Sequence, residues 1–245
     1  MKAKKKFMIS GQSITKTEKR EGNVEEKYIK IQYELQKQIE FHNSIDIRLI
    51  ENVAGVDLAY WNKKGNEYAV CCIIVLNYET QEVVEKKYAV EKVTVPYIPG
   101  CLAFRELPVF LKVYKTLDTD VDIFFFDGNG YLHPRHMGVV THAGIIINKP
   151  TIGIAKSYLK INNTEFCMPA MKALSYTDIK IDNEIYGRVL RTQSGVKPVF
   201  LSIGNKIDLD TAMEITNTLV TKDSHIPLPT RLADIMTHEI RKKYI

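Results

Sequence analysis

Three acidic residues lie in or next to apolar segments, where burying a charged carboxylate costs free energy, and together they could bind a divalent cation. Asp127 ends the most apolar run of the chain, VDIFFFDG, so its carboxylate is expected at the carboxyl edge of a strand, where α/β sheets bind ligands. Asp57 interrupts VAGVDLAYW on the same side as Val53 and Ala59, which puts a charge on a buried strand face. Glu106 lies in the predicted first turn of a helix. Three converging carboxylates suit Mg²⁺, and the predicted reaction is phosphodiester hydrolysis.

Each of these acidic residues also has a structural explanation. Asp127 precedes a glycine and could be a turn residue, and Glu106 could stabilise its helix through the helix dipole. For Asp57 and Asp127 taken together, the structural explanation is weaker, because a buried lone carboxylate costs several kcal/mol. The pair therefore favours a shared cation or basic partners.

A basic segment follows Asp127. The run DGNGYLHPRHMGVVTHAG contains His133, Arg135, His136 and His142. The histidine spacing is not that of a zinc site, so the segment predicts phosphate contacts or orientation of other ligands. Lys156 ends the apolar run TIGIAK and would reach the same sheet edge as Asp127, where an ammonium could neutralise phosphate charge. The structural alternative is a solvated strand end.

A proline-rich turn precedes the Glu106 helix. Pro96 and Pro99 flank Tyr97 and Ile98, which makes a rigid and apolar protrusion. Such a protrusion could separate stacked bases. The residues alone favour the alternative, an ordinary loop packed on the core.

The elements expected to position these residues form one α/β domain. The patterns predict helices over 25–42, 102–117, 135–148, 209–220 and 230–244, with Pro108 in the first turn of the second. Strands are predicted over 53–61, 68–77, 83–93, 121–127 and 151–156, with further strands over 185–203. The first connection, at Gly65, is short and indicates an antiparallel hairpin. We expect a mixed sheet flanked by helices in residues 23–245, after a flexible basic extension over 1–22.

The composition excludes several classes of protein. The 245 residues carry a net charge of +5, all of it within residues 1–30, so the rest of the chain is neutral. No apolar run is long enough to cross a membrane, and the basic start MKAKKKFMIS is followed by a polar stretch, so we expect no secretory signal. The four cysteines lack zinc-site spacing. We therefore expect a cytoplasmic protein, with a nuclear location as the alternative that the first lysines suggest.

The order of these motifs resembles the endonuclease V family of inosine-directed nucleases. The resemblance rests on PYIPGCLAFRE, DGNGYLHPRHMGVVTHAG and GIAKS, and extends from VAGVDLAY through GRVLRTQSGVKPVFLSIG to PLPTRLAD. It covers about residues 25–240. It implies a ribonuclease-H-like fold, dependence on Mg²⁺ or Mn²⁺, and hydrolysis of the second phosphodiester 3′ to inosine in DNA or RNA. The expected partner is therefore an inosine-containing strand, bound by a monomer.

The resemblance also implies roles for individual residues. Asp57 and Asp127 match the metal-binding aspartates, Glu106 the third catalytic carboxylate and Lys156 the catalytic lysine. The expected substrate-binding residues are Pro96, Tyr97, Ile98 and Pro99 in the strand-separating wedge, Gly100, Leu102, Gly128 and Gly138 around the extruded base, and Arg105 and His133. His142 stays without an assigned role.

One departure from the family pattern bears on catalysis. Asn205 stands in LSIGNK where the family usually has a histidine, which the resemblance puts near the metal site. An amide cannot titrate as imidazole does. An alternative function is therefore a protein that binds inosine-containing strands but cleaves them poorly. A ribonuclease-H-like resolvase or exonuclease is a third possibility, against which the wedge and the pocket glycines count.

Overall fold

The protein is built around one mixed sheet of eight strands. The computed structural model describes the backbone of residues 16–245. The strands are β1 (Asn52–Lys63), β2 (Asn66–Asn77), β3 (Val83–Lys92), β4 (Ile123–Phe126), β5 (Thr151–Ala155), β6 (Ser175–Ile181), β7 (Glu184–Arg191) and β8 (Val199–Asn205). The helices are α1 (Lys16–Gln36), α2 (Leu102–Tyr114), α3 (Val139–Ile147), α4 (Leu209–Thr218) and α5 (Leu228–Lys242), with a short 3₁₀ turn, η1 (Ile47–Leu49).

The sheet has the predicted ribonuclease-H-like arrangement. Its strand order is β3-β2-β1-β4-β5-β8-β7-β6. The first three strands are antiparallel, and β4 and β5 then run parallel to β1, as expected. Beyond β5 the sheet continues with antiparallel β8, β7 and β6, of which β6 was not predicted because its sequence, SYTDIKI, is largely polar. The parallel strands β1, β4 and β5 therefore form the centre of the sheet.

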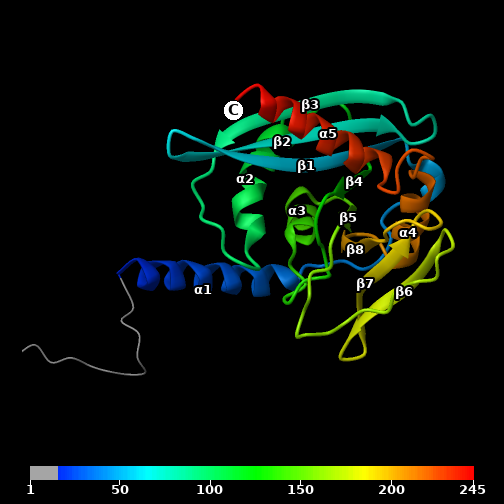
Figure 1. Cartoon of the computed structure of the whole chain (residues 1–245), viewed down its shortest axis with the longest axis horizontal. Coiled ribbons are helices and arrows are strands. Elements are labelled where there is room, and N and C mark those ends of the chain that lie inside the picture. Colours follow the sequence, from blue (N-terminus) through cyan, green and yellow to red (C-terminus); the bar gives the residue numbers. More distant parts are fainter. Residues whose placement is uncertain (1–15) are drawn as a thin grey trace, which may run out of the picture.

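Helices cover both faces of this centre, with α2 and α3 on one side and α5 on the other (Figure 1). Alternate residues of β1 and β4 face the two layers: Val56 and Phe126 pack with α2 and α3, while Val53 and Phe125 pack in the core on the other face. Asp57 and Asp127 follow the parity of Val53 and Phe125. Both acidic side chains are therefore on the α5 side, where the alternation predicts them.

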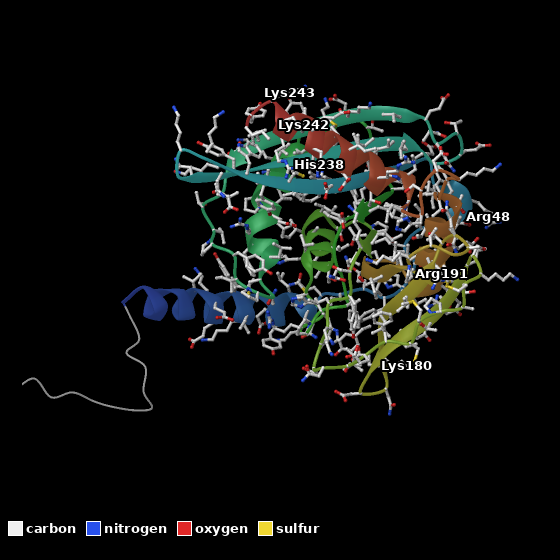
Figure 2. All side chains as sticks on the ribbon, in the orientation of Figure 1. Arg48, Lys180, Arg191, His238, Lys242 and Lys243 are labelled. Atoms are coloured by element: carbon white, nitrogen blue, oxygen red, sulfur yellow. The ribbon has the colours of Figure 1, made fainter. Side chains whose placement is uncertain are left out.

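Gly55 allows α5 to lie directly on β1. A Cβ atom at this position would stand 1.9 Å from the Pro229 carbonyl oxygen at the start of α5. Only a residue without a side chain permits this approach of helix to strand. His238, labelled in Figure 2, marks the part of α5 that lies over β1. The close contact fixes which face of α5 the strand meets.

Some element boundaries differ from those predicted. Helix α2 begins at Leu102, so Pro108 lies in its second turn and Glu106 has already passed the first, which corrects both placements. The dipole explanation of Glu106 is thereby weakened. Helix α3 is shorter than predicted because HPRHMG precedes it as a loop. Within the expected extension, residues 1–15 lie outside the described residues, while residues 16–22 belong to α1. Within the described part, no helix has both the length and the apolarity to cross a membrane.

Candidate active site

Three carboxylates meet at the carboxyl edge of the parallel strands. Oxygen atoms of Asp57, Asp127 and Asp234 all lie within 4.8 Å of one another. Asp57 and Asp127 are neighbours because Val56 and Phe126 are paired in register, and the Asp127 N–H donates to the Val56 carbonyl. The third carboxylate comes from α5. Asp234 ends the segment PLPTRLAD, which carries part of the family resemblance, but it is not among the predicted site residues.

A signal for Asp234 was present in the helical periodicity. The buried residues of α5 recur at spacings of three and four, at Thr230, Ala233, Thr237 and Ile240. Asp234 falls within this stripe, so a helical projection puts it next to the sheet. An acidic residue on the apolar side of a helix needs a partner, as Asp57 does on its strand.

Lys156 joins the cluster from the end of β5. Its Nζ lies 2.7 Å from Asp127 Oδ2 and 2.8 Å from Asp234 Oδ1. Although partial burial opposes it, hydrogen bonds to these two carboxylates raise the pKa of Lys156. The lysine is thus charged and points at the carboxylates, as the sequence predicts.

Asp57 is the most deeply buried of the three carboxylates. Its side chain accepts a hydrogen bond from Thr237 Oγ1 at 2.8 Å, and the residue is only 8% exposed. Burial raises the pKa of Asp57 to about 6, and the charges of Asp127 and Asp234 add to this shift. Three clustered carboxylates, one of them destabilised by burial, are the oxygen ligands that Mg²⁺ or Mn²⁺ takes. The residues therefore fit a divalent cation.

The buried charge of Asp57 predicts a stability cost in metal-free protein. Folding raises the pKa of Asp57 from 3.8 to about 6. The side chain therefore adds most to the free energy of unfolding below pH 3.8, and this contribution is lost as the pH rises through 6. In a chelator, Asp57→Asn should raise the free energy of unfolding by about 1–3 kcal/mol above pH 7. The gain should vanish near pH 4, as measured by denaturant unfolding. If Asp57→Asn lowers the free energy of unfolding at both pH values, the buried charge of Asp57 does not destabilise the metal-free protein.

Glu106 approaches the cluster from α2. The Tyr60 hydroxyl donates to Glu106 Oε1 at 3.0 Å. Burial raises the pKa of Glu106 to about 7, with Asp57 and Asp127 contributing through their charges. Its carboxylate is not one of the three within 4.8 Å, but a group with this pKa can accept or release a proton near neutral pH.

The neighbouring Arg105 makes contacts within the protein. Its guanidinium is buried, donates to the Val95 carbonyl, forms an ion pair with Glu67 and lies over the Tyr60 ring at 4.7 Å. These contacts hold the chain just before the wedge, which starts at Pro96. Its predicted contact with substrate stays a prediction.

A cavity of about 360 Å³ opens beside the carboxylates. Seven of the predicted substrate-binding residues line it: Tyr97, Pro99, Gly100, Leu102, Gly128, His133 and Gly138. Gly128 follows Asp127 directly, so cavity and carboxylates share one loop. Tyr97 is 66% exposed, and Pro96 and Ile98 stand beside it without lining the cavity. Residues that were not predicted also line the cavity, among them Asn129 and Leu159.

The two predicted histidines have different surroundings. His133 Nε2 donates to the Gly100 carbonyl at 3.1 Å, while its Nδ1 accepts from the Arg135 N–H at 3.1 Å. Burial lowers the pKa of His133 to about 4, with Arg135 contributing, so the ring is neutral. His142 lies under Phe104, with ring centroids 5.1 Å apart, and burial lowers its pKa to about 4 as well. His142 therefore packs in the core rather than in the cavity.

Asn205 lies apart from the carboxylates, which corrects the expected place of this residue. It pairs with Thr151 at the start of β5, whereas Lys156 follows the other end of that strand. Its Oδ1 accepts from the Glu40 N–H at 2.9 Å, so the amide holds the segment that follows α1.

Comparisons with known proteins agree with this site. The family model for endonuclease V matches residues 33–235. Endonuclease V of Bacillus thuringiensis is 54% identical over 218 residues, which cover 89% of this chain and 93% of the relative. The crystal structure of the Bacillus subtilis endonuclease V has a TM-score of 0.88 at 50% identity and covers 90% of this chain and 93% of that chain. A crystal structure of Ciona intestinalis endonuclease V in complex with a 24mer DNA containing an inosine followed by a ribo-adenosine has a TM-score of 0.81 at 26% identity, covering 91% of this chain and 100% of that chain.

The mixed sheet, with its carboxylates and lysine at the edge of the parallel strands, defines a ribonuclease-H-like phosphodiester hydrolase. With the family model matched over most of the chain and relatives at about half identity, the particular family is also shown. The chain belongs to the endonuclease V family. It is an endonuclease with an acidic site that suits a metal ion.

Proposed function

We propose that this endonuclease hydrolyses the second phosphodiester 3′ to an inosine in DNA or RNA, leaving a 5′-phosphate. The observation that carries the proposal is the shared loop: Asp127 belongs to the carboxylate cluster, and Gly128 lines the cavity. If a base of the nucleic acid occupies the cavity, a phosphate of the same nucleic-acid strand, a short way along its backbone, lies at the carboxylates. The site therefore suits cleavage at a fixed offset from a recognised base.

The carboxylates Asp57, Asp127 and Asp234 would hold Mg²⁺ or Mn²⁺. A bound divalent cation polarises the phosphate and makes water a stronger nucleophile. The Lys156 ammonium, 2.7 Å from Asp127, neutralises charge that develops on the phosphate. Glu106, held by the Tyr60 hydroxyl on the neighbouring strand β1, would orient the attacking water.

The cavity would receive the extruded base. Gly100, Gly128 and Gly138 have no side chains, so backbone groups can approach the edge of a purine. Tyr97, exposed between its prolines, fills the gap that extrusion leaves, at a cost of a few kcal/mol for unstacking. On its base edge inosine has a donor N–H and an acceptor carbonyl, where adenine has an acceptor nitrogen and a donor amino group. Backbone donors and acceptors at fixed positions can therefore distinguish the two bases.

The test uses end-labelled DNA and RNA strands that carry one inosine, each with a matched adenine control. With Mg²⁺, we expect a single cut one nucleotide beyond the inosine and no cut in the control. No cleavage of either inosine strand, or equal cleavage of the controls, would refute the proposal. The ratio of DNA to RNA rates gives the preferred nucleic acid.

The second candidate, a strand-binding protein with impaired cleavage, loses its support from the structure. It depended on Asn205 being near the metal site, and the amide instead bonds to Glu40. We further propose that the enzyme acts as a monomer in the cytoplasm.

A further inference from the structure

A glutamine of the N-terminal helix is buried behind the cavity. Gln32, on α1, is fully shielded from solvent. Its Nε2 donates to the carbonyls of Gly100 at 2.9 Å and Met137 at 3.2 Å, and its Oε1 accepts from Arg135 Nε at 2.6 Å. Gly100, Met137 and Arg135 line the cavity, whereas Gln32 does not. The amide thus joins two loops that form the cavity wall.

The Gly100 carbonyl is the centre of this arrangement. Besides Gln32, it accepts from Arg135 Nη2 at 2.7 Å and from His133 Nε2 at 3.1 Å. Gly100 has a φ of +73°, and a Cβ there would stand 2.6 Å from Arg135 Nη2. Three donors directed at one oxygen fix the orientation of the Gly100 carbonyl and of the adjoining peptide groups.

The same helix is anchored beside this wall by a second contact. The Tyr28 ring, one helical turn before Gln32, stacks on Phe104 with centroids 3.9 Å apart and planes 5° from parallel. Phe104 directly follows Leu102 and Ala103, which line the cavity. Helix α1 therefore contacts the wall through an aromatic pair and through an amide with defined donors and acceptor.

We propose that Gln32 is a positioning residue for base recognition: it holds the Gly100 carbonyl and the Arg135 guanidinium, and so sets the shape of the cavity that selects inosine. This inference rests on the proposed function, because it assigns the cavity to the extruded base. It adds the N-terminal helix to the recognition machinery, all of whose other residues come from later in the chain.

The test is Gln32→Glu, which is nearly isosteric. The new carboxylate still accepts from Arg135, but it presents oxygen instead of N–H to the Gly100 and Met137 carbonyls, and these groups repel one another. We expect kcat/KM on the inosine strand to fall about tenfold or more, mainly through KM, with the cleavage position unchanged. In an Asp127→Asn background, anisotropy should show weaker binding of the inosine strand and unchanged binding of the adenine strand. Gln32→Leu, which lacks all three hydrogen bonds, should lose more of the preference.

Two controls separate recognition from stability. Glu34→Gln alters an exposed residue of the same helix whose partner is Lys37, and should leave selectivity unchanged. Ile215→Ala opens a void at a buried position of α4, away from the cavity, and should lower Tm without altering selectivity. If wild type prefers inosine but Gln32→Glu keeps the same ratio of inosine to adenine binding, the inference is overturned. If wild type itself shows no preference, the proposed function has failed instead.

Discussion

Asp127→Asn should abolish strand cleavage and leave binding of the inosine strand largely intact. Asp127 extends from the end of β4 next to Asp57, and its Oδ2 holds the Lys156 ammonium at 2.7 Å. The amide keeps the size of the side chain but removes the charge that attracts both the lysine and a divalent cation. We expect a loss of at least about 10²–10³-fold in the single-turnover rate.

The measurement pairs cleavage with binding. Single-turnover rates are taken with saturating Mg²⁺, and anisotropy gives the affinity for the same strand in Ca²⁺ or chelator. Asp118→Asn, at an exposed residue bonded to Lys87, is the matched control and should cleave normally. A variant at 127 that cleaves like the control would remove this residue from the reaction.

Asp234→Asn should cause a loss of similar size. Its carboxylate lies within 4.8 Å of those of Asp57 and Asp127 and holds Lys156 at 2.8 Å. Residues that act as one unit show non-additive effects, so the double variant with Asp127→Asn should be scarcely slower than either single one. Thermal stabilisation by Mn²⁺ should also weaken in each variant, which tests the cation site without reference to turnover.

The control for this variant is on the same helix. Glu239 is exposed on α5, so Glu239→Gln changes the charge of the helix without touching the cluster. It should retain full activity and the full response to Mn²⁺. If Asp234→Asn cleaves at the wild-type rate, Asp57, Asp127 and Lys156 suffice for cleavage, and Asp234 only anchors the lysine.

The sequence predicts the strand carboxylates well because the physics there is local. Asp57 and Asp127 each interrupt or end an apolar run, and parallel neighbours necessarily bring such positions to one edge. The turn of Tyr97 and the glycines of the cavity, by contrast, are assigned only through the resemblance to the endonuclease V family, because the residues alone favour an ordinary loop. For the two aspartates, the spacing along one or two strands is enough to place the side chain.

The residues that sequence reasoning missed depend on packing between distant elements. Asp234 reaches the site only because α5 rests on β1 at Gly55. Gln32 reaches the cavity wall only because α1 runs below α2 and its last turns lie next to α3 (Figure 1). Asn205 was expected near the metal site, but the register of β8 against β5 puts it at the opposite end from Lys156. Helix docking and strand register are properties of the assembled sheet, and a single sequence without its fold does not specify them.

The contribution of α5 to the cluster also bears on the order in which the activity appears during translation. Asp57 and Thr237, which touch in the folded protein, are 180 residues apart in the chain. Domains acquire structure as the ribosome releases them, and the sheet strands emerge before α5. A nascent chain with a formed cavity thus still lacks Asp234, so the cluster of three carboxylates is complete only when α5 docks.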